Sequence, residues 1–438
     1  MHQLSYSFTD KQVTPWGGLR LIQDFYERCG LRDQIRALDL PEPGSNRGYS
    51  PADLIEGFIV SVILGAKRFA HSGMLRHDDV IREIFGWKKG MASQSTFSRF
   101  FPKMTLEKSD QNFAQLNSWW FSQLGIDKIT VDLDSTVITR FGEQEYVEVG
   151  YNPKRHGRAS HHPIIAFASE PKMIVQAWMR SGDSSASTDL KEFFSEVLAV
   201  LPKQRIGLVR ADSGFYGNEV LQYFETQEVN YIISARMNGG LVNVIFNQYS
   251  WYQAQDGIEY CSFEYKANGW SKSRRMVVVR KDSEKLSKSG GKTLFKEYDD
   301  FANYRYSAFV TNSELSADLI WTIYKHRAEA ENQIKELKFD YGIEGFCSEK
   351  FEGTEAAFRW AMVAYNLMSL FKMTILKYKH LPMLSSIKFQ CIAIGSYLVK
   401  RSRKKELKLA VKDKRRSFIE ELFQKVENIK PPFSFSNA

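Results

Sequence analysis

The stretch KITVDLDST, residues 128–136, marks the point where the sequence changes from helical patterning to strand patterning. Apolar and polar residues alternate along it, which is typical of a strand, and it ends at Asp134 and two small polar residues. A carboxylate at the end of a strand is held by the sheet, and it faces the edge where ligands bind in α/β folds. Asp132 points to the same face, so the strand offers two candidate carboxylates. Taken alone, an aspartate in this position is more often a turn former than a metal ligand.

A second aspartate follows another apolar strand. The stretch VRADSGFYG, residues 209–217, places Asp212 after the strand, and two glycines flank the turn that follows. An ordinary capped turn between a strand and a helix would look the same. Further strands are predicted over 163–168, 173–179, 206–211 and 229–235, with helices over 187–201 and 217–226. This order predicts an α/β fold with a mixed, partly parallel sheet.

A third carboxylate lies in a long helix predicted over residues 316–339. Tyr324, Arg327, Glu331 and Lys338 are spaced so that, at 100° per residue, they fall within about 60° of one another. An apolar stripe runs beside them and suits packing against a sheet. A solvated helix face also collects Lys, Arg and Glu, so that alternative stays open.

Three carboxylates on one edge of a sheet and a helix suit magnesium, which prefers oxygen ligands. Two such ions stabilise both the attacking and the leaving oxygen of a phosphodiester displacement. Arg327 and Lys338 can pair with phosphates, and Tyr324 can donate a hydrogen bond to a phosphate oxygen. Because the segments involved are far apart in the sequence, we expect the site to be poorly formed until metal and DNA bind.

These motifs together resemble bacterial insertion-sequence transposases of the DDE type. The helix matches their Y-(2)-R-(3)-E-(6)-K signature, and DST at 134–136 and ADSGFY at 211–216 resemble their first two carboxylate motifs. GYNPK at 150–154, GR at 157–158, HP at 162–163 and AYNL at 364–367 are similar to one branch of the family. The resemblance covers most of residues 50–375.

The resemblance implies an RNase H-like catalytic core, with a mixed sheet, flanking helices and a β-rich subdomain inserted between Asp212 and Glu331. It implies that Asp134, Asp212 and Glu331 are the catalytic residues and hold two Mg²⁺ ions, for which Mn²⁺ can substitute. Asp134 is preferred to Asp132 because the family's aspartate precedes a small residue and a threonine. The resemblance further implies that Tyr324, Arg327 and Lys338 contact DNA near the cut end.

The implied function is cut-and-paste DNA transposition. The protein would bind the terminal inverted repeats of its own insertion sequence, cleave the ends and join the 3′-hydroxyl to target DNA, as a homodimer in the synapse. Whether a hairpin intermediate forms is left open. Two alternatives remain: a domesticated DNA-binding protein that is catalytically idle, and a non-transposing nuclease with the same metal site.

Five regions are expected along the chain. They are an N-terminal helical DNA-binding domain (1–125), the first part of the core (126–237), the β-rich insertion (238–302), the second part of the core with the catalytic helix (303–345) and a C-terminal helical region (346–438). In the first region, ASQSTFSRF at 92–100 predicts either the second helix of a helix-turn-helix or a short capped helix. A surface loop is expected over 283–292, and C-terminal helices over 354–378, 385–399 and 415–426.

Basic segments offer further candidate DNA contacts. The chain has 60 basic and 51 acidic residues. This surplus of positive charge mildly favours an anionic partner. Lys154 and Arg158, in a basic loop that continues to two histidines at 161–162, are candidates for lining a DNA channel. Residues 400–416 hold ten basic and two acidic residues and are expected to form a basic helix that grips phosphates. Trp251 and Trp270 can stack on an unpaired base, although core packing is favoured for both.

The remaining composition limits the class of protein. The four cysteines are widely separated, which argues against a disulfide scaffold and a zinc ribbon and favours a reducing cytoplasm. Histidines 156, 161 and 162 lack the spacing of a zinc site. No apolar run is long enough to span a bilayer, and the N-terminus lacks a signal-peptide pattern. We therefore expect a cytoplasmic protein without membrane contact, and the resemblance to the transposases implies that it is bacterial and nucleoid-associated.

Overall fold

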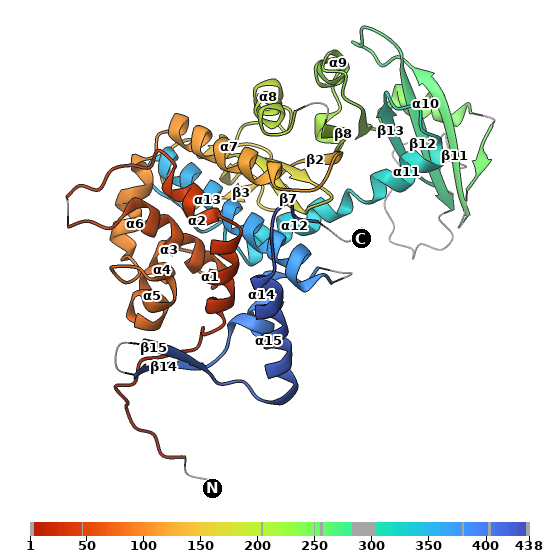
Figure 1. Ribbon diagram of the computed structural model, residues 1–438. Coiled ribbons are helices and arrows are strands. Elements are labelled where there is room, and N and C mark those ends of the chain that lie inside the picture. Colours follow the sequence, from red (N-terminus) through yellow and green to blue (C-terminus); the bar gives the residue numbers. More distant parts are fainter. Residues whose placement is uncertain are drawn as a thin grey trace.

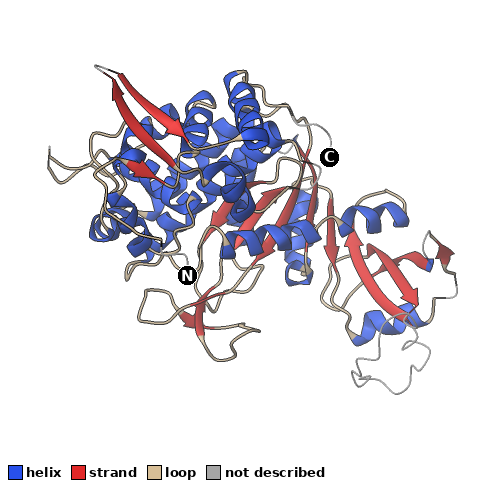
Figure 2. Cartoon of the chain, turned by 90° about the horizontal axis from the view of Figure 1, so that it is seen from below, coloured by secondary structure: helices blue, strands red, loops and turns tan. Residues whose placement is uncertain are grey.

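The computed structural model describes residues 4–45, 47–202, 205–248, 250–254, 257–282, 304–378, 381–401 and 404–434 of the chain. The loop expected over 283–292 lies outside these residues. A helical region at the N-terminus packs beside a large mixed sheet, and a lobe of strands extends from the far edge of that sheet (Figures 1 and 2). No helix within the described ranges has the length and apolar character needed to cross a bilayer.

The helices are α1 (Leu19–Arg28), α2 (Leu31–Arg36), α3 (Pro51–Ile63), α4 (Phe69–Met74), α5 (Asp79–Phe85), α6 (Gln94–Phe100), α7 (Leu106–Ser122), α8 (Leu190–Val200), α9 (Asn218–Thr226), α10 (Gly239–Phe246), α11 (Ala317–Lys325), α12 (Ala328–Phe339), α13 (Phe351–Phe371), α14 (Leu384–Ile387) and α15 (Asp413–Glu427). Shorter turns are η1 (Leu75–His77), η2 (Phe101–Lys103), η4 (Ser213–Phe215), η7 (Lys372–Leu376) and η8 (Lys388–Ile392). The strands are β1 (Val13–Thr14), β2 (Ile129–Ser135), β3 (Ile138–Thr139), β4 (Glu148–Val149), β5 (Ala159–His161), β6 (Ile164–Ala168), β7 (Met173–Trp178), β8 (Ile206–Ala211), β9 (Tyr231–Ser234), β10 (Tyr252–Gln253), β11 (Ile258–Tyr265), β12 (Arg274–Asp282), β13 (Tyr304–Thr311), β14 (Ser396–Arg401) and β15 (Lys404–Leu409).

The large sheet confirms the expected mixed α/β fold. Its strand order is β10-β11-β12-β13-β9-β8-β2-β6-β7. Strand β2 runs parallel to β8 and antiparallel to β6, and β8 runs parallel to β9. In β2 the fully buried Val131 and Leu133 alternate with Asp132 and Asp134, so the two aspartates share the opposite face. The strands and helices expected between residues 128 and 235 are all present within a few residues of their predicted limits.

The β-rich segment does not form a separate sheet. Strands β10 to β13 continue the large sheet, because β13 pairs antiparallel with β9 through partners such as Val310 and Ile233. Helix α11 covers one face of this extension, where Ile320 packs with Phe309 and Val277. The β-rich character expected for 238–302 is present in β10, β11 and β12, and β13, about 70 residues after β9, buries the apolar edge of β9.

Helix α13 is the centre of the helical region. All but one of its residues are buried, including Trp360 and Phe371, as expected for a helix surrounded by protein on every side. It contacts α3, α7 and η2 on one side and β7 on the other. The N-terminal helices thus share one core with a C-terminal helix and with the sheet.

Side chains cover the edge strand β7. Asn366 accepts a hydrogen bond from the Ile174 N–H (2.6 Å) and donates one to the Ile174 carbonyl (2.8 Å). Asn117 donates to the Val175 carbonyl (2.9 Å). Because an open edge invites pairing with other strands, these amides close the sheet at this end.

The C-terminal region differs from the expectation. The helix predicted over 354–378 is present as α13 and η7, but residues 396–401 and 404–409 form the antiparallel hairpin β14–β15 instead of helix. Leu398 and Leu407 face each other across it and pack against the core, which is the alternation of a strand. The third strand of this small sheet is β1, where Val13 pairs with Tyr397. The basic segment is therefore a ribbon followed by the start of α15.

Helix α6 is a short capped helix. The Ser93 hydroxyl accepts a hydrogen bond from the Thr96 N–H (3.3 Å), and Phe97 and Phe100 face the core. It packs against α4. Both alternatives for 92–100, the second helix of a helix-turn-helix and a short capped helix, include a helix of this kind.

Candidate active site

The first two candidate carboxylates lie side by side at one edge of the large sheet. Strands β2 and β8 are parallel, and Leu133 pairs with Ala211, so Asp134 and Asp212 follow on neighbouring strands at the same end. Asp212 begins η4, and its Oδ1 accepts the Gly214 N–H (2.8 Å). Asp134 Oδ1 accepts the Ser135 N–H (2.8 Å). Both aspartates thus form turn-type hydrogen bonds, yet they converge at the open end of a parallel pair.

Arg327 connects these strands to the third carboxylate. Its Nη2 lies 3.2 Å from Asp134 Oδ2, and its Nη1 lies 3.8 Å from Glu331 Oε1. Arg327 is buried, whereas the Glu331 side chain is 60% exposed. Arg327 therefore lies between Glu331 and Asp134, and most of the Glu331 side chain remains exposed to solvent.

The helix that carries these residues is not continuous, which corrects the prediction of one helix over 316–339. It divides into α11 and α12 at His326 and Arg327, where the Arg327 N–H bonds to the Tyr324 carbonyl (2.9 Å) and the Ala330 N–H to that of Arg327 (2.9 Å). These i→i+3 bonds tighten the chain by comparison with an α-helix. The single polar stripe calculated for a straight helix therefore does not describe the arrangement, although Tyr324, Arg327 and Glu331 still face the sheet edge.

Burial sets the electrostatics of the site. It raises the pKa of Asp134 from 3.8 to about 6, and the charges of Asp212 and Glu331 act in the same direction. The Arg327 guanidinium opposes this rise. Burial lowers the pKa of Arg327, but the charges of Asp134, Tyr324, Asp212 and Asp132 together outweigh burial, so that the pKa lies above its usual value. A positive charge beside Asp134 is thus what stabilises its ionised form.

Asp132 is occupied by a different partner. Arg210 on β8 donates two hydrogen bonds to its carboxylate, from Nε to Oδ1 (2.6 Å) and from Nη2 to Oδ2 (2.7 Å). Arg210 Nη1 also donates to the Ile323 carbonyl (2.5 Å), which attaches α11 to the sheet. Sequence reasoning missed Arg210, although a charged residue inside the apolar run IGLVRA was a visible signal.

Tyr324 lies beside the second aspartate. Its hydroxyl donates to the Ala211 carbonyl (3.2 Å), and its ring packs against Phe309 with centroids 4.5 Å apart. Burial raises the pKa of Tyr324, and the nearby Arg327 opposes the rise. The phenol thus stays protonated and able to donate a hydrogen bond.

Lys338 does not contact the carboxylates. Its Nζ donates to the Val137 carbonyl (2.7 Å), just beyond β2, and pairs with Glu344 (3.1 Å). Burial lowers its pKa, the Glu344 carboxylate raises it, and the charge of Lys154 lowers it. Lys154 thus lies within electrostatic reach of Lys338.

The loop that carries Lys154 and Arg158 is shaped by Asn152. Its Oδ1 accepts the Arg155 N–H (3.1 Å), and its Nδ2 donates to the Thr139 hydroxyl (3.0 Å). Lys154 and Arg158 themselves are exposed. The structure places this loop just after the strand that carries Asp134, as part of the small sheet β3-β5-β4.

The neighbouring histidines are held by the protein itself. His161 accepts from Arg140 Nε at Nδ1 (3.0 Å), and burial lowers its pKa to about 4. His162 hydrogen-bonds the Ser184 carbonyl (2.5 Å) and the Ser135 hydroxyl (3.2 Å), and burial lowers its pKa too. His162 thus supports the residue next to Asp134.

The two tryptophans considered for base stacking pack within the protein. An arginine guanidinium lies over each ring, Arg280 over Trp251 at 4.0 Å and Arg274 over Trp270 at 4.9 Å. Trp270 is buried beside Tyr216. Both have the packing role that the sequence favoured.

The carboxylates suit a hard divalent cation, since oxygen is their only donor. In the part of the chain that the structure describes, no three His, Cys, Asp or Glu side chains are close enough together to hold a metal. The guanidinium between Asp134 and Glu331 shows, however, that this position accommodates positive charge. The oxygen donors of Asp134 and Glu331 thus have the chemistry that such an ion needs, and the positive charge beside them is that of Arg327.

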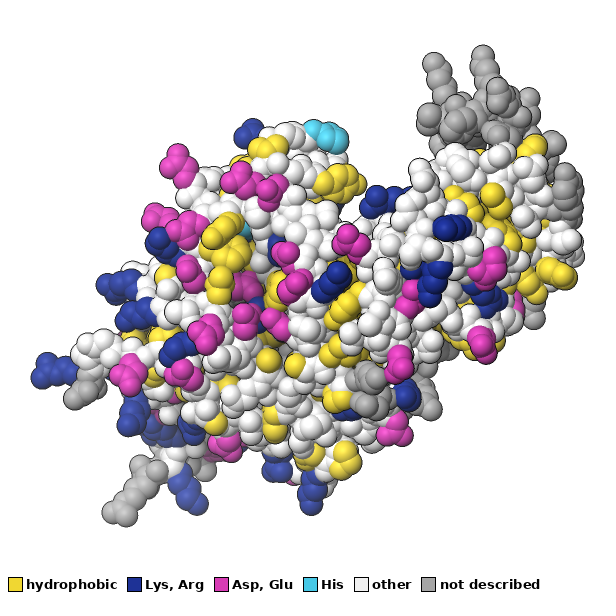
Figure 3. Space-filling model, turned by 90° about the horizontal axis from the view of Figure 1, so that it is seen from above, with side chains coloured by type: hydrophobic (Ala, Val, Ile, Leu, Met, Phe, Trp, Pro, Cys, Tyr) yellow, Lys and Arg dark blue, Asp and Glu magenta, His cyan; other side chains and the backbone are white. Residues whose placement is uncertain are grey.

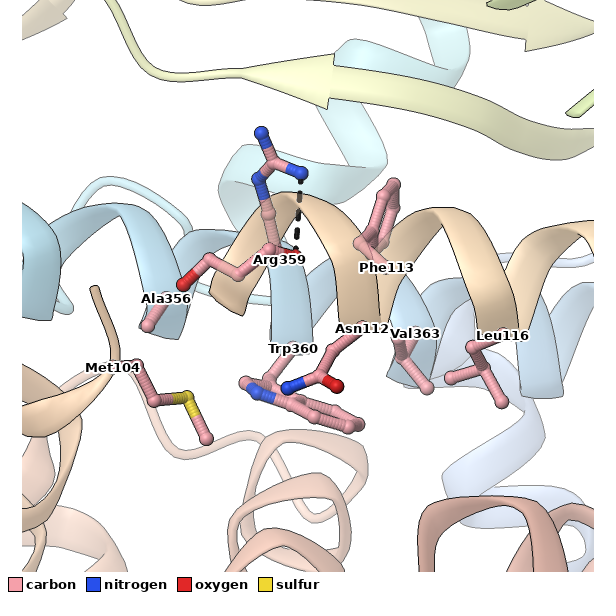
Figure 4. Close-up of a pocket in the computed structure, with 9 residues that line it drawn as sticks. Met104, Asn112, Phe113, Leu116, Ala356, Arg359, Trp360 and Val363 are labelled. Carbon is pink, nitrogen blue, oxygen red and sulfur yellow. Dashed lines mark hydrogen bonds between the residues drawn. The ribbon is translucent and has the colours of Figure 1, made fainter. Parts of the chain in front are cut away.

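A small cavity elsewhere has a different character. It lies between α7 and α13, and Figure 4 shows apolar side chains such as Leu116 and Val363 around it. Arg359 at its rim is engaged by Glu355, with Nε 2.6 Å from Oε1, and by Asp110. This cavity is a packing feature of the helical core.

Comparison with known proteins identifies the family. Residues 1–431 match the transposase DDE domain, group 1. No curated protein matches the chain. Among solved structures, a piggyBac transposase in a synaptic complex with hairpin DNA is similar over 95% of this chain and 82% of that chain, with 9% sequence identity and a TM-score of 0.41. Because the family match spans nearly the whole sequence, the chain belongs to the transposase DDE domain group 1 family.

Proposed function

We propose that this protein is a DNA transposase that binds the terminal inverted repeats of its own insertion sequence, cleaves the ends and joins the 3′-hydroxyl to target DNA. One observation carries the proposal: Asp134 and Asp212 end neighbouring parallel strands, and Arg327 links Asp134 to Glu331. Membership of a transposase family supports the same conclusion.

We assign the catalytic core to the RNase H-like class. Counted along the chain, β2, β6, β7, β8 and β9 lie in the order 3-2-1-4-5, and β6 alone runs against the others. An RNase H-like core has this order and these directions. The Asp134 strand is then central, and the helix with Glu331 approaches it from one face, where α12 contacts β2.

Asp134, Asp212 and Glu331 are the residues that would hold two magnesium ions. When bound, such a pair stabilises the attacking and leaving oxygens of a phosphodiester displacement. Arg327 holds Asp134 and Glu331 together before DNA arrives, and its five donors then suit a phosphate of the bound strand. Asp132 fixes Arg210, and Arg210 fixes the end of α11, so this pair positions the helix and is not itself a ligand.

The DNA lies along the residues beyond the carboxylates. Tyr324 offers a protonated hydroxyl, and Lys338 offers a half-buried ammonium at the exit of β2. Lys154 and Arg158 extend this basic surface on the loop that follows. Because a transposon has two equivalent ends, two copies of the chain related by a two-fold axis are the simplest synapse.

The test is cleavage and joining of DNA that carries the element's own terminal repeat. The wild-type protein should cut the repeat end and join it to a target only when Mg²⁺ or Mn²⁺ is present. Cleavage without joining would replace the proposal by a nuclease. Binding of the repeat without cleavage in either metal would replace it by an idle DNA-binding protein.

A further inference from the structure

The positive charge of the chain is concentrated in one segment. Residues 400–416 carry ten basic and two acidic residues, which accounts for eight of the nine surplus positive charges of the whole protein. On the face shown in Figure 3, by contrast, basic and acidic side chains are interspersed. The remaining chain is therefore close to neutral, and an anionic partner is attracted chiefly to this segment.

The segment is a ribbon held on one side. Leu398, Leu407 and Leu409 pack against the core, and the Leu398 N–H bonds to the Gln12 carbonyl (3.0 Å) beside β1. Lys405 forms an ion pair with Glu83 on α5 (2.6 Å). Hairpin β14–β15 lies below α5 in Figure 1 and leads directly into α15. The two described strands of the ribbon are thus attached to the rest of the protein on one side.

The protein balances part of the charge on the ribbon, because Lys405 pairs with Glu83 and Lys408 pairs with Glu406. Lys400 lies directly opposite Lys405 in the hairpin register, and like charges in that position destabilise a strand pair. Lys400, Lys404, Lys412 and Lys414 are exposed, and none of the ion pairs found among the described residues involves them. An external anion would relieve the repulsion that the fold leaves in place.

We propose that β14–β15 and the first turn of α15 form a clamp for the phosphate backbone of duplex DNA, apart from the carboxylate site. The six residues of β15 extend about 20 Å, which is close to the rise of about six base pairs. Lysines act as point charges on phosphates, so the clamp binds without reading sequence. Tyr397 is the one exposed aromatic residue on the described part of the ribbon, too few for a single-strand stacking surface.

The clamp rests on the proposed function, because it gives the same protein a second contact with its DNA substrate. Lysines on the ribbon would hold flanking or target DNA while the carboxylates act on the transposon end. The clamp therefore changes how strongly DNA is bound and leaves the chemistry of bound DNA alone.

The test compares two triple variants of the full chain. The first is Lys400→Gln, Lys404→Gln and Lys414→Gln; the matched control is Lys191→Gln, Lys377→Gln and Lys430→Gln, which removes the same charge from exposed positions elsewhere. Binding to a random-sequence duplex of about 40 base pairs is measured against salt concentration. Loss of three phosphate contacts should reduce the slope of log K against log salt by about 3, and the affinity at low salt about tenfold or more.

Each result has one meaning for the clamp. If the control keeps the wild-type slope and the ribbon variant loses it, the proposal stands. If both variants behave alike, the proposal is overturned. If the ribbon variant loses affinity for vesicles of anionic lipid but not for the duplex, the ribbon is a membrane contact and the proposal is again overturned.

A cleavage assay separates the clamp from the proposed function. With DNA saturating at low salt, the ribbon variant should cut the repeat end at the wild-type rate, and Asp134→Asn should bind with the wild-type salt slope without cutting. If the wild-type protein never cuts but binds with a slope that depends on the ribbon, the clamp stands and the proposed function fails. If the wild-type protein cuts the repeat end and the ribbon variant keeps the wild-type salt slope, the proposed function stands and the clamp fails.

Discussion

The guanidinium of Arg327 lies against the carboxylate of Asp134, with Nη2 3.2 Å from Oδ2, and both side chains are buried. The contact joins residues almost 200 positions apart in the sequence, one at the end of a central strand and one where α11 gives way to α12. It holds the start of α12 against the sheet.

Replacing Arg327 with Gln should destabilise the metal-free protein by about 3 kcal/mol, because a buried carboxylate loses its partner. Magnesium should recover more stability in this variant than in the wild type, since a divalent ion then supplies the missing charge. Urea unfolding with EDTA and with Mg²⁺ measures both effects. Arg327→Lys keeps the positive charge and serves as the control. Its free energy of unfolding should lie between those of wild type and Arg327→Gln. Equal stability of Arg327→Gln and wild type would show that the contact is not a structural link.

The raised pKa of Asp134 has a consequence for stability. Since burial raises it from 3.8 to about 6, the folded protein binds this proton more tightly than the unfolded chain does. The stability that the protonated group contributes is therefore lost as the pH rises from about 4 through about 6. This loss amounts to at most about 3 kcal/mol.

Asp134→Asn should remove this dependence, so that the stability of the metal-free variant changes less between pH 4 and 8 than that of the wild type. Denaturant unfolding between pH 4 and 8 in EDTA gives the comparison, and the exposed Asp127→Asn is the control. Parallel pH profiles for wild type and Asp134→Asn would contradict the shift.

Asp132 and Asp134 should respond to substitution in opposite ways. Asp132→Asn leaves Arg210 buried without its charged partner, which should cost about 3 kcal/mol of stability. The rise in melting temperature on adding Mn²⁺ should persist in Asp132→Asn and disappear in Asp134→Asn. The opposite pattern would make Asp132 the metal ligand.

Asn366→Ala should weaken the edge of the sheet. The change removes both hydrogen bonds to Ile174, which should lower the free energy of unfolding by about 2 to 3 kcal/mol. Hydrogen exchange at the Ile174 amide should become faster than in wild type. Gln111→Ala on the exposed face of α7 provides a control with little effect. Unchanged exchange at Ile174 would contradict this role.

The parts of the fold that depend on local pattern could be predicted from the sequence. Asp134 and Asp212 each follow an apolar strand, and their position at strand ends is confirmed. The break between α11 and α12 could not be predicted, because no Pro or Gly marks it. It accompanies the contact of Arg327 with a residue far away in the sequence.

Non-local pairing explains the other differences. Strand β13 joins β9 across an intervening segment of about 70 residues, and hairpin β14–β15 is completed by Val13 and Thr14 near the other end of the chain. A dense run of lysines between apolar residues fits a helix or a strand equally well until such a partner is known. Helical spacing and the family signature both place Lys338 in line with Glu331, whereas in the structure the Val137 carbonyl and Glu344 hold its side chain.

The most direct measurement of the central claim compares wild type, Glu331→Gln and Glu329→Gln on DNA with the element's terminal repeat and Mg²⁺. Glu329 lies on the same helix, two residues away, where it pairs with Lys172, so its substitution controls for loss of charge on α12. The account predicts that all three proteins bind the repeat, that wild type and Glu329→Gln cleave it and join it to target DNA, and that Glu331→Gln does neither. Cleavage by Glu331→Gln at the wild-type rate would contradict the assignment of the third carboxylate and with it the proposed active site.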